Sequence, residues 1–128
     1  QKNYAEAKSF YSALLVQVQA VEKPTPQQQQ VEVYSLNWLV DIALQQSDLS
    51  TAEVLLAESW PMIEHRQDVR SQAFHQRSKA QLEKYRGNLS DFRHWSQQAK
   101  NSFERLGMQT QALEMQAWLN DASSAGIS

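Results

Sequence analysis

The three histidines are the first side chains in this sequence that could do chemistry, because an imidazole can bind a metal or move a proton near neutral pH. His65, His75 and His94 fall in different predicted helices, and none has a second histidine or a carboxylate at the spacing of a zinc site. Asp91 and His94, one helical turn apart, come nearest to such a spacing. A helix end, a partly exposed helix face and a first-turn position account for the three, so the sequence predicts no metal site and no cofactor.

The sequence gives little support for an acid–base pair or a catalytic nucleophile. Glu64, Glu83 and Asp91 stand among polar residues on predicted exposed turns, and there is no glycine-rich phosphate loop or serine elbow. The chain has no cysteine, which excludes thiol nucleophiles, thiolate metal sites and disulfides. The sequence therefore predicts that the protein is not an enzyme.

The four tryptophans could stack nucleic-acid bases or fill space between helices. Trp38, Trp60, Trp95 and Trp118 stand in helical register, which favours packing. The formal net charge is −2 and the basic residues form no stripe, so direct nucleic-acid binding is not expected. No apolar run approaches the ~20 residues of a membrane-spanning helix, so no membrane partner is expected either.

Helices must position all of these residues. Only three glycines and three prolines occur and nothing alternates with period two, so the sequence predicts an all-α protein. About six helices are expected, at residues 3–22, 26–46, from 50 onward, 69–86, 91–106 and 109–122. Pro61 either kinks the third helix or ends it near Ser59. The fourth helix is the most polar, and its apolar residues are Ala73, Phe74, Ala80, Leu82 and Tyr85.

Helix ends can be assigned from short motifs. Gly87 is expected to end the fourth helix and Ser90 to cap the fifth. Ser50 with Glu53 has the spacing of a capping box, and Thr25 with Gln28 has it too.

The turns recur with a fixed period. Asn3, Asp48 and Asn88 each begin a similar short pattern, with 45 residues between the first two and 40 between the last two. A five-residue extension at the start of the second helix would account for the longer first spacing. The stretch that starts at Trp38 recurs at Trp118, two such periods later. A period of this length indicates stacked helical repeats. We therefore expect a single repeat domain over residues 1–128 with repeat turns near 2–4, 47–50 and 87–90. The chain opens partway through a repeat and without Met, so we expect a fragment of a longer protein.

These motifs resemble the tetratricopeptide repeat. The matching segments are Asn3-Tyr4-x-x-Ala7-x-x-x-Tyr11, Asp48-Leu49-x-x-Ala52-x-x-x-Leu56, Asn88-Leu89-x-x-Phe92, Asn37-Trp38-Leu39 and Ala117-Trp118-Leu119. The period of 40 exceeds the usual 34 and is similar to that of arrays in large bacterial signalling regulators, such as maltose-activator-type transcription factors, and of arrays attached to signalling ATPases. The resemblance implies a right-handed α-solenoid of antiparallel helix pairs.

In such a solenoid the first helix of each pair lines a concave groove. The resemblance places in it the site residues Tyr34, Asn37, Asp41, Phe74, Arg77, Gln81 and Lys84, with Glu114, Ala117 and Asp121 from the last repeat. Amides, a guanidinium and aromatic rings suit an extended peptide or a partner helix.

The function that the resemblance implies is a non-enzymatic protein- or peptide-binding module of a larger regulatory or signalling protein, expected in the cytoplasm. The alternative is a ligand-sensing solenoid of a transcription activator or signalling ATPase. Self-association through the open N-terminal repeat face is a further expectation.

Overall fold

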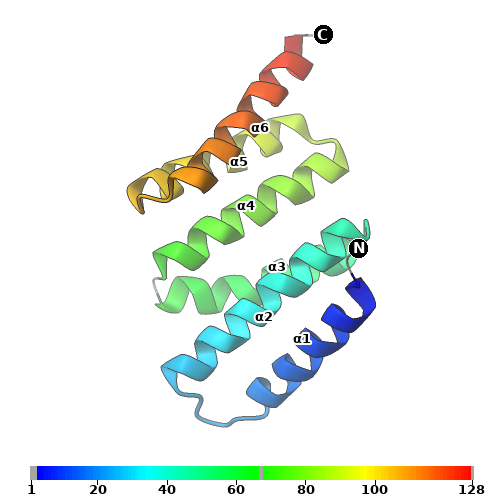
Figure 1. The fold of residues 1–128 in the computed structure, drawn as a ribbon, viewed down its shortest axis with the longest axis vertical. Coiled ribbons are helices and arrows are strands. Elements are labelled where there is room, and N and C mark those ends of the chain that lie inside the picture. The colour runs from blue at the N-terminus through cyan, green and yellow to red at the C-terminus, as the bar shows by residue number, and fades with distance from the viewer. Residues whose placement is uncertain (1–2, 67, 128) are drawn as a thin grey trace. The chain divides into compact units, whose positions relative to one another are not determined.

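The computed structural model describes residues 3–66 and 68–127, with side chains for all of these except 66 and 123–127. Over these ranges the backbone forms six α-helices and no strand (Figure 1), which confirms the all-α prediction. The helices are α1 (Tyr4–Gln19), α2 (Pro26–Gln45), α3 (Leu49–Arg66), α4 (Val69–Arg86), α5 (Leu89–Arg105) and α6 (Gln109–Ile127). None of these described helices is long and apolar enough to cross a membrane.

The chain divides into two compact units, unit 1 (Gln1–Met62) and unit 2 (Ile63–Ser128). The division falls inside α3, directly after Met62, and Pro61 stands beside it. The expectation of a single repeat domain over residues 1–128 stays a prediction.

In unit 1, α1 packs along α2, and the two helices run in opposite directions (Figure 1). Their connection ends at Thr25, whose hydroxyl accepts a hydrogen bond from the Gln28 N–H while the Gln28 side chain accepts one from the Thr25 N–H. This capping box confirms the prediction, and Pro26 stands where its missing N–H costs nothing. The buried aliphatic residues of α1 and α2 are Val18, Val33, Leu36, Leu39, Val40, Ile42, Ala43 and Leu44.

In unit 2, α5 packs against both α4 and α6. One core cluster joins the three helices through Ala73, Ala99, Phe103, Ala112 and Met115. A second cluster, nearer the end of α6, consists of Ala80, Phe92 and Ala122 with Trp118 packed against it. Alanines at the α4–α5 contact allow the two helix backbones to approach closely, and the aromatic rings fill the space beside them.

Helices α2, α4 and α5 end in the same hydrogen-bonded turn. At Gly87 the backbone is left-handed (φ 78°), and the Asn88 N–H reaches back to the Glu83 carbonyl at 2.9 Å. Gly107 ends α5 in the same way. Ser47 adopts the left-handed conformation after α2 (φ 61°), and the Asp48 N–H donates to Ala43 at 2.8 Å. Two of these turns, at Ser47 and Gly87, have the 40-residue spacing found in the sequence.

The predicted caps of α3 and α5 are wrong by two residues. Asp48, not Ser50, caps α3 by accepting the Thr51 N–H at 3.3 Å. Asn88, not Ser90, caps α5 by accepting from the Asp91 N–H. In both cases the left-handed turn ends directly before the Asp or Asn, so the helix begins one residue later and the serine already lies inside its first turn.

Helix α3 continues through Pro61 to Arg66, so an end near Ser59 is excluded. Pro61 has no N–H to donate to the carbonyl four residues back, and the surrounding residues maintain the helix despite that loss. Helix α6 also continues past its expected end at Ala122, as far as Ile127.

Helix α4 buries only some of its apolar residues. Ala73, Ala80 and Leu82 are buried, whereas the exposed fraction of Tyr85 is 46%. Three polar residues take up buried positions instead: Ser71, His75 and Ser78. They follow one another at spacings of four and three, so they form one face of the helix that apolar patterning could not reveal.

Candidate functional site

The predicted groove residues divide between the two units. Tyr34, Asn37 and Asp41 lie on α2 in unit 1, at spacings that place them on one helix face. Phe74, Arg77, Gln81 and Lys84 lie on one face of α4 in unit 2. A single groove lined by both sets stays a prediction, and the surroundings of each set are found within its own unit.

Tyr34 belongs to an aromatic cluster formed by Phe10, Tyr11, Tyr34 and Trp38. Tyr11 from α1 stacks on Trp38 from α2 with parallel rings and a centroid distance of 5.6 Å. Tyr34 meets both of these rings edge-on at 6.2 Å. Phe10 meets Tyr11 edge-on at 5.1 Å. These contacts hold α1 and α2 together and give the four rings a defined arrangement.

Much of the aromatic cluster is open to solvent. The exposed fractions are 61% for Phe10, 51% for Tyr34 and 41% for Trp38. The pKa of the Tyr11 phenol is raised, first by its partial removal from water and then by the neighbouring Tyr34 phenol. The Tyr11 hydroxyl therefore stays protonated at neutral pH and remains a hydrogen-bond donor. Large exposed aromatic surfaces of this kind are typical of binding sites.

Two polar residues stand beside the aromatic cluster on α2. The side-chain carbonyl oxygen of Asn37 is enclosed and has no hydrogen-bond partner among the residues that the structure describes. Asp41, one turn after Trp38, is partly exposed and forms no ion pair with any described residue. The only carboxylate of this helix face therefore remains open to a partner.

The Arg77 side chain contacts two residues of α6 within unit 2. Its Nε and Nη2 donate to the two carboxylate oxygens of Glu114 on α6, both at 2.8 Å. Its guanidinium also lies over the Trp118 ring, 5.1 Å from the centroid. The structure thus brings together two predicted groove residues, Arg77 and Glu114. They bind each other and link α4 to α6.

The other predicted residues of α4 differ in their availability. Phe74 is half-buried and packs edge-on against Phe103 at 5.2 Å. The side-chain carbonyl oxygen of Gln81 is enclosed and without a hydrogen-bond partner among the described residues. Lys84 is exposed, as are Ala117 and Asp121 on α6. Of the four α4 residues, Lys84 is thus the one whose polar group is open to a ligand.

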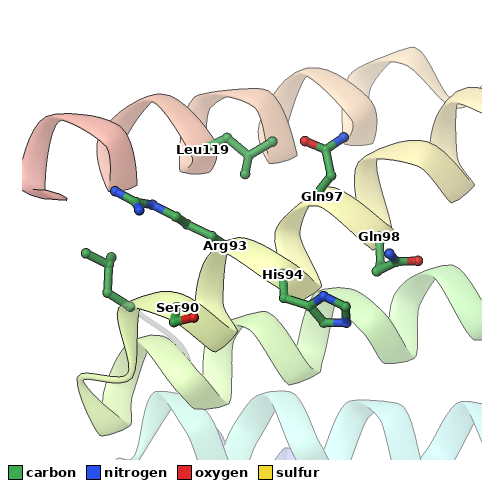
Figure 2. A pocket seen from close by; sticks show the side chains of 7 residues that line it. Ser90, Arg93, His94, Gln97, Gln98 and Leu119 are labelled. Atoms are coloured by element: carbon green, nitrogen blue, oxygen red, sulfur yellow. The ribbon is translucent and has the colours of Figure 1, made fainter.

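An open hollow of about 770 Å³ lies over α5 and α6 (Figure 2). Figure 2 shows Arg93 and Gln97 extending from α5 toward α6, beside Leu119, while His94 points away from Arg93. The Arg93 Nη2 donates to the Ala122 carbonyl at 2.8 Å. The Ser90 hydroxyl and the His94 imidazole are not hydrogen-bonded to each other.

A smaller cavity of about 120 Å³ lies in unit 1, between α1, α2 and α3. Leu39, Ile42 and Leu55 supply apolar lining, and Lys8 and Asp48 supply charge. The pKa of the Asp48 carboxyl is lowered, mainly by hydrogen bonds from Thr51 at the start of α3. Because its carboxylate already serves as a helix cap, Asp48 has limited capacity for a ligand.

The histidines lie apart from any cluster of metal ligands. Across the described parts of the chain no three His, Asp or Glu side chains converge. His65 and His94 are exposed, and the His94 ring packs edge-on against Trp95 at 5.0 Å. His75 is only 2% exposed, so its expected place on a partly exposed face is wrong. Burial, and to a lesser extent the nearby Lys79, lowers the pKa of His75 to about 4, so the imidazole is neutral at pH 7.

The sequence predicts a packing role for Trp38 and does not place Phe10 or Tyr11 in the site. The spacing held a signal, because Trp38 stands four residues after Tyr34 and shares its helix face. The contribution of α1 had no such signal, since it depends on how α1 packs on α2.

Comparison of the chain with family models, with curated proteins and with solved structures finds no match.

Proposed function

We propose that this protein is a non-enzymatic module that binds a protein or peptide, built as a tetratricopeptide-like α-solenoid of antiparallel helix pairs with a right-handed superhelix. The support for the repeat is the 40-residue spacing of the left-handed turns at Ser47 and Gly87, each followed by an Asp or Asn cap. We further propose that the module serves a larger bacterial regulatory or signalling protein in the cytoplasm.

The observation that carries the binding role is the exposed aromatic cluster. Three of its rings, those of Phe10, Tyr34 and Trp38, have exposed fractions above 40%. Tyrosine and tryptophan bring large contact area at low conformational cost, and they are enriched among residues that dominate binding energy. Tyr34, predicted to line the groove, is part of this cluster.

A matched pair of variants tests the proposal. Peptides selected from a random display library on the wild-type chain would be measured against Tyr34→Ser and Tyr85→Ser by fluorescence anisotropy. Tyr85 is exposed to a similar extent, 46%, but lies on α4 in unit 2, outside the cluster. Loss of a binding tyrosine should weaken affinity at least about fivefold in the first variant and leave the second unchanged.

Equal affinities in the two variants would show that the cluster is not the binding surface. If selection enriches no peptide at all, the ligand-sensing alternative gains support, and small molecules would be screened next against the cavity lined by Lys8 and Leu39.

A further inference from the structure

Trp38 on α2 and Trp118 on α6 occupy corresponding positions. Each begins a Trp-Leu-x-Asp stretch, and the stretches lie 80 residues apart. Each ring also stacks on an aromatic residue of the preceding helix. Trp38 stacks on Tyr11 of α1 at 5.6 Å, and Trp118 stacks on Phe92 of α5 at 6.0 Å. In each unit, therefore, a tryptophan stacks on an aromatic ring of the preceding helix.

In unit 2 this arrangement includes a cation. The Arg77 guanidinium lies over Trp118, and Glu114 fixes it with two hydrogen bonds of 2.8 Å. Glu114 stands one turn before Trp118 on the same face of α6. A planar guanidinium fits such a site because it can stack on the ring and bind a carboxylate through two N–H groups at once.

In unit 1 the corresponding tryptophan differs in its surroundings. No Lys or Arg of the described residues lies over Trp38, and 41% of its surface is exposed. A carboxylate is nevertheless present one turn away, although it follows the tryptophan as Asp41 instead of preceding it. Tyr34 takes the place that Glu114 has in unit 2. Asp41 forms no ion pair with any described residue.

The charge around this site favours a cationic partner. Residues 1–62 carry three lysines, no arginine and seven carboxylates, a formal net charge of −4. Residues 63–128 carry nine basic side chains against seven carboxylates, a net charge of +2. Unit 1 thus combines exposed aromatic rings with an excess of negative charge, which attracts cations over several ångströms.

We propose that the exposed face of Trp38, together with Asp41, binds an arginine side chain presented by a partner protein. The inference rests on the proposed binding function and specifies the partner's chemistry at the aromatic cluster. Arginine is favoured over lysine because its flat guanidinium stacks on the indole while donating to Asp41, whereas the compact ammonium is more strongly hydrated. The intramolecular contact of Arg77 with Trp118 and Glu114 shows that a guanidinium in this chain can lie over a tryptophan ring while it binds a carboxylate of the same helix.

Tryptophan indole N–H signals in nuclear magnetic resonance spectra of the full chain test this directly. The probes are acetyl-Ala-Arg-Ala-amide, acetyl-Ala-Lys-Ala-amide and acetyl-Ala-Leu-Ala-amide, titrated into the wild type and Asp41→Asn. The arginine peptide should shift the Trp38 signal with the tightest binding of the three. Asp41→Asn should weaken that binding about two- to fivefold, as expected for a partly exposed ion pair.

Arg77→Ala provides the matched control, because it uncovers Trp118 and Glu114. In that variant the arginine peptide should also shift the Trp118 signal, which stays unchanged in the wild type. A Trp118 signal that does not respond would overturn the inference, since the uncovered Trp118 and Glu114 would then not bind a guanidinium. Circular dichroism checks that Arg77→Ala folds. If it does not fold, the affinities of the wild type and Asp41→Asn for the arginine peptide still test the inference.

The outcomes separate this inference from the proposed function. Equal binding of the three peptides, unaffected by Asp41→Asn, would overturn the arginine specificity while leaving peptide binding in place. If none of the three peptides shifts Trp38 and display-selected peptides also fail to do so, both proposals fall.

Discussion

Arg77 on α4 and Glu114 on α6 form a bidentate ion pair, with both N–O distances at 2.8 Å, across 37 residues of sequence. The pair joins α4 and α6, both of which pack against α5. Arg77 also covers Trp118, so the guanidinium fixes both a carboxylate and a ring of α6.

We expect Arg77→Met and Glu114→Gln each to lower the free energy of unfolding by about 1 kcal/mol, since the pair is bidentate but partly exposed. In a double-mutant cycle followed by urea unfolding, the coupling energy should be roughly 0.5–1 kcal/mol. Additive losses in the double variant would contradict a direct interaction.

The assignment of Asn88 as the cap of α5 predicts unequal effects at two neighbouring positions. Asn88→Ala should destabilise by about 1 kcal/mol because the Asp91 N–H loses its acceptor. Ser90→Ala should change stability by less than about 0.5 kcal/mol, since Ser90 is an exposed residue of the first turn. Chemical denaturation of both variants distinguishes them, and the reverse order would restore Ser90 as the cap.

The left-handed turns at Ser47 and Gly87 predict opposite effects of exchanging their residues. Ser47→Gly should stabilise by about 0.5–1 kcal/mol because glycine adopts φ 61° without steric cost. Gly87→Ser should destabilise by about 1 kcal/mol for the converse reason. An added Cβ at Gly87 meets no atom within 4 Å, so the cost there is conformational. Thermal unfolding measures both changes, and shifts of the same sign would refute the turn geometry.

Pro61 lies inside a continuous helix, and its replacement should therefore be favourable. Pro61→Ala restores a backbone hydrogen bond of α3 and should stabilise by about 1–3 kcal/mol. Pro26→Ala is the control, because proline at the first position of α2 is well placed and its loss should cost about 0.5 kcal/mol. If Pro61→Ala destabilises the chain, the proline shapes α3 in a way that alanine cannot reproduce.

The buried His75 should make stability depend on pH. Its pKa is about 4 in the folded chain against 6.5 for an ordinary histidine, because burial disfavours the charged imidazole and Lys79 adds to that effect. The unfolded chain therefore binds a proton first as pH falls, and stability is lost between pH 6.5 and 4. From pH 7 to pH 5 this group should remove about 2 kcal/mol.

The control for this prediction is His75→Gln, which has a similar polar side chain and does not titrate. Its unfolding free energy should vary less between pH 7 and pH 5 than that of the wild type. Equal pH dependence of the two chains would show that His75 is protonated in the folded state or lies exposed.

Short-range features could be predicted because a few adjacent residues encode them. Thr25, Pro26 and Gln28 form their capping box within four residues, and Gly87 ends α4 through its own backbone freedom. The caps of α3 and α5 were misassigned for an equally local reason. An Asp or Asn and a Ser stand two residues apart, and only the preceding left-handed turn decides which of them caps the helix.

The sequence by itself determined that this chain is helical, approximately where each helix lies, and that two of its turns lie 40 residues apart, because these properties follow from local propensity and spacing. Tertiary structure decided which side chains meet. It buried His75 on a helix with little apolar patterning, drew Arg77 to Glu114, and left Trp38 open where Trp118 is covered. These contacts depend on how helices distant in the sequence pack against each other, and no local sequence pattern predicts that packing.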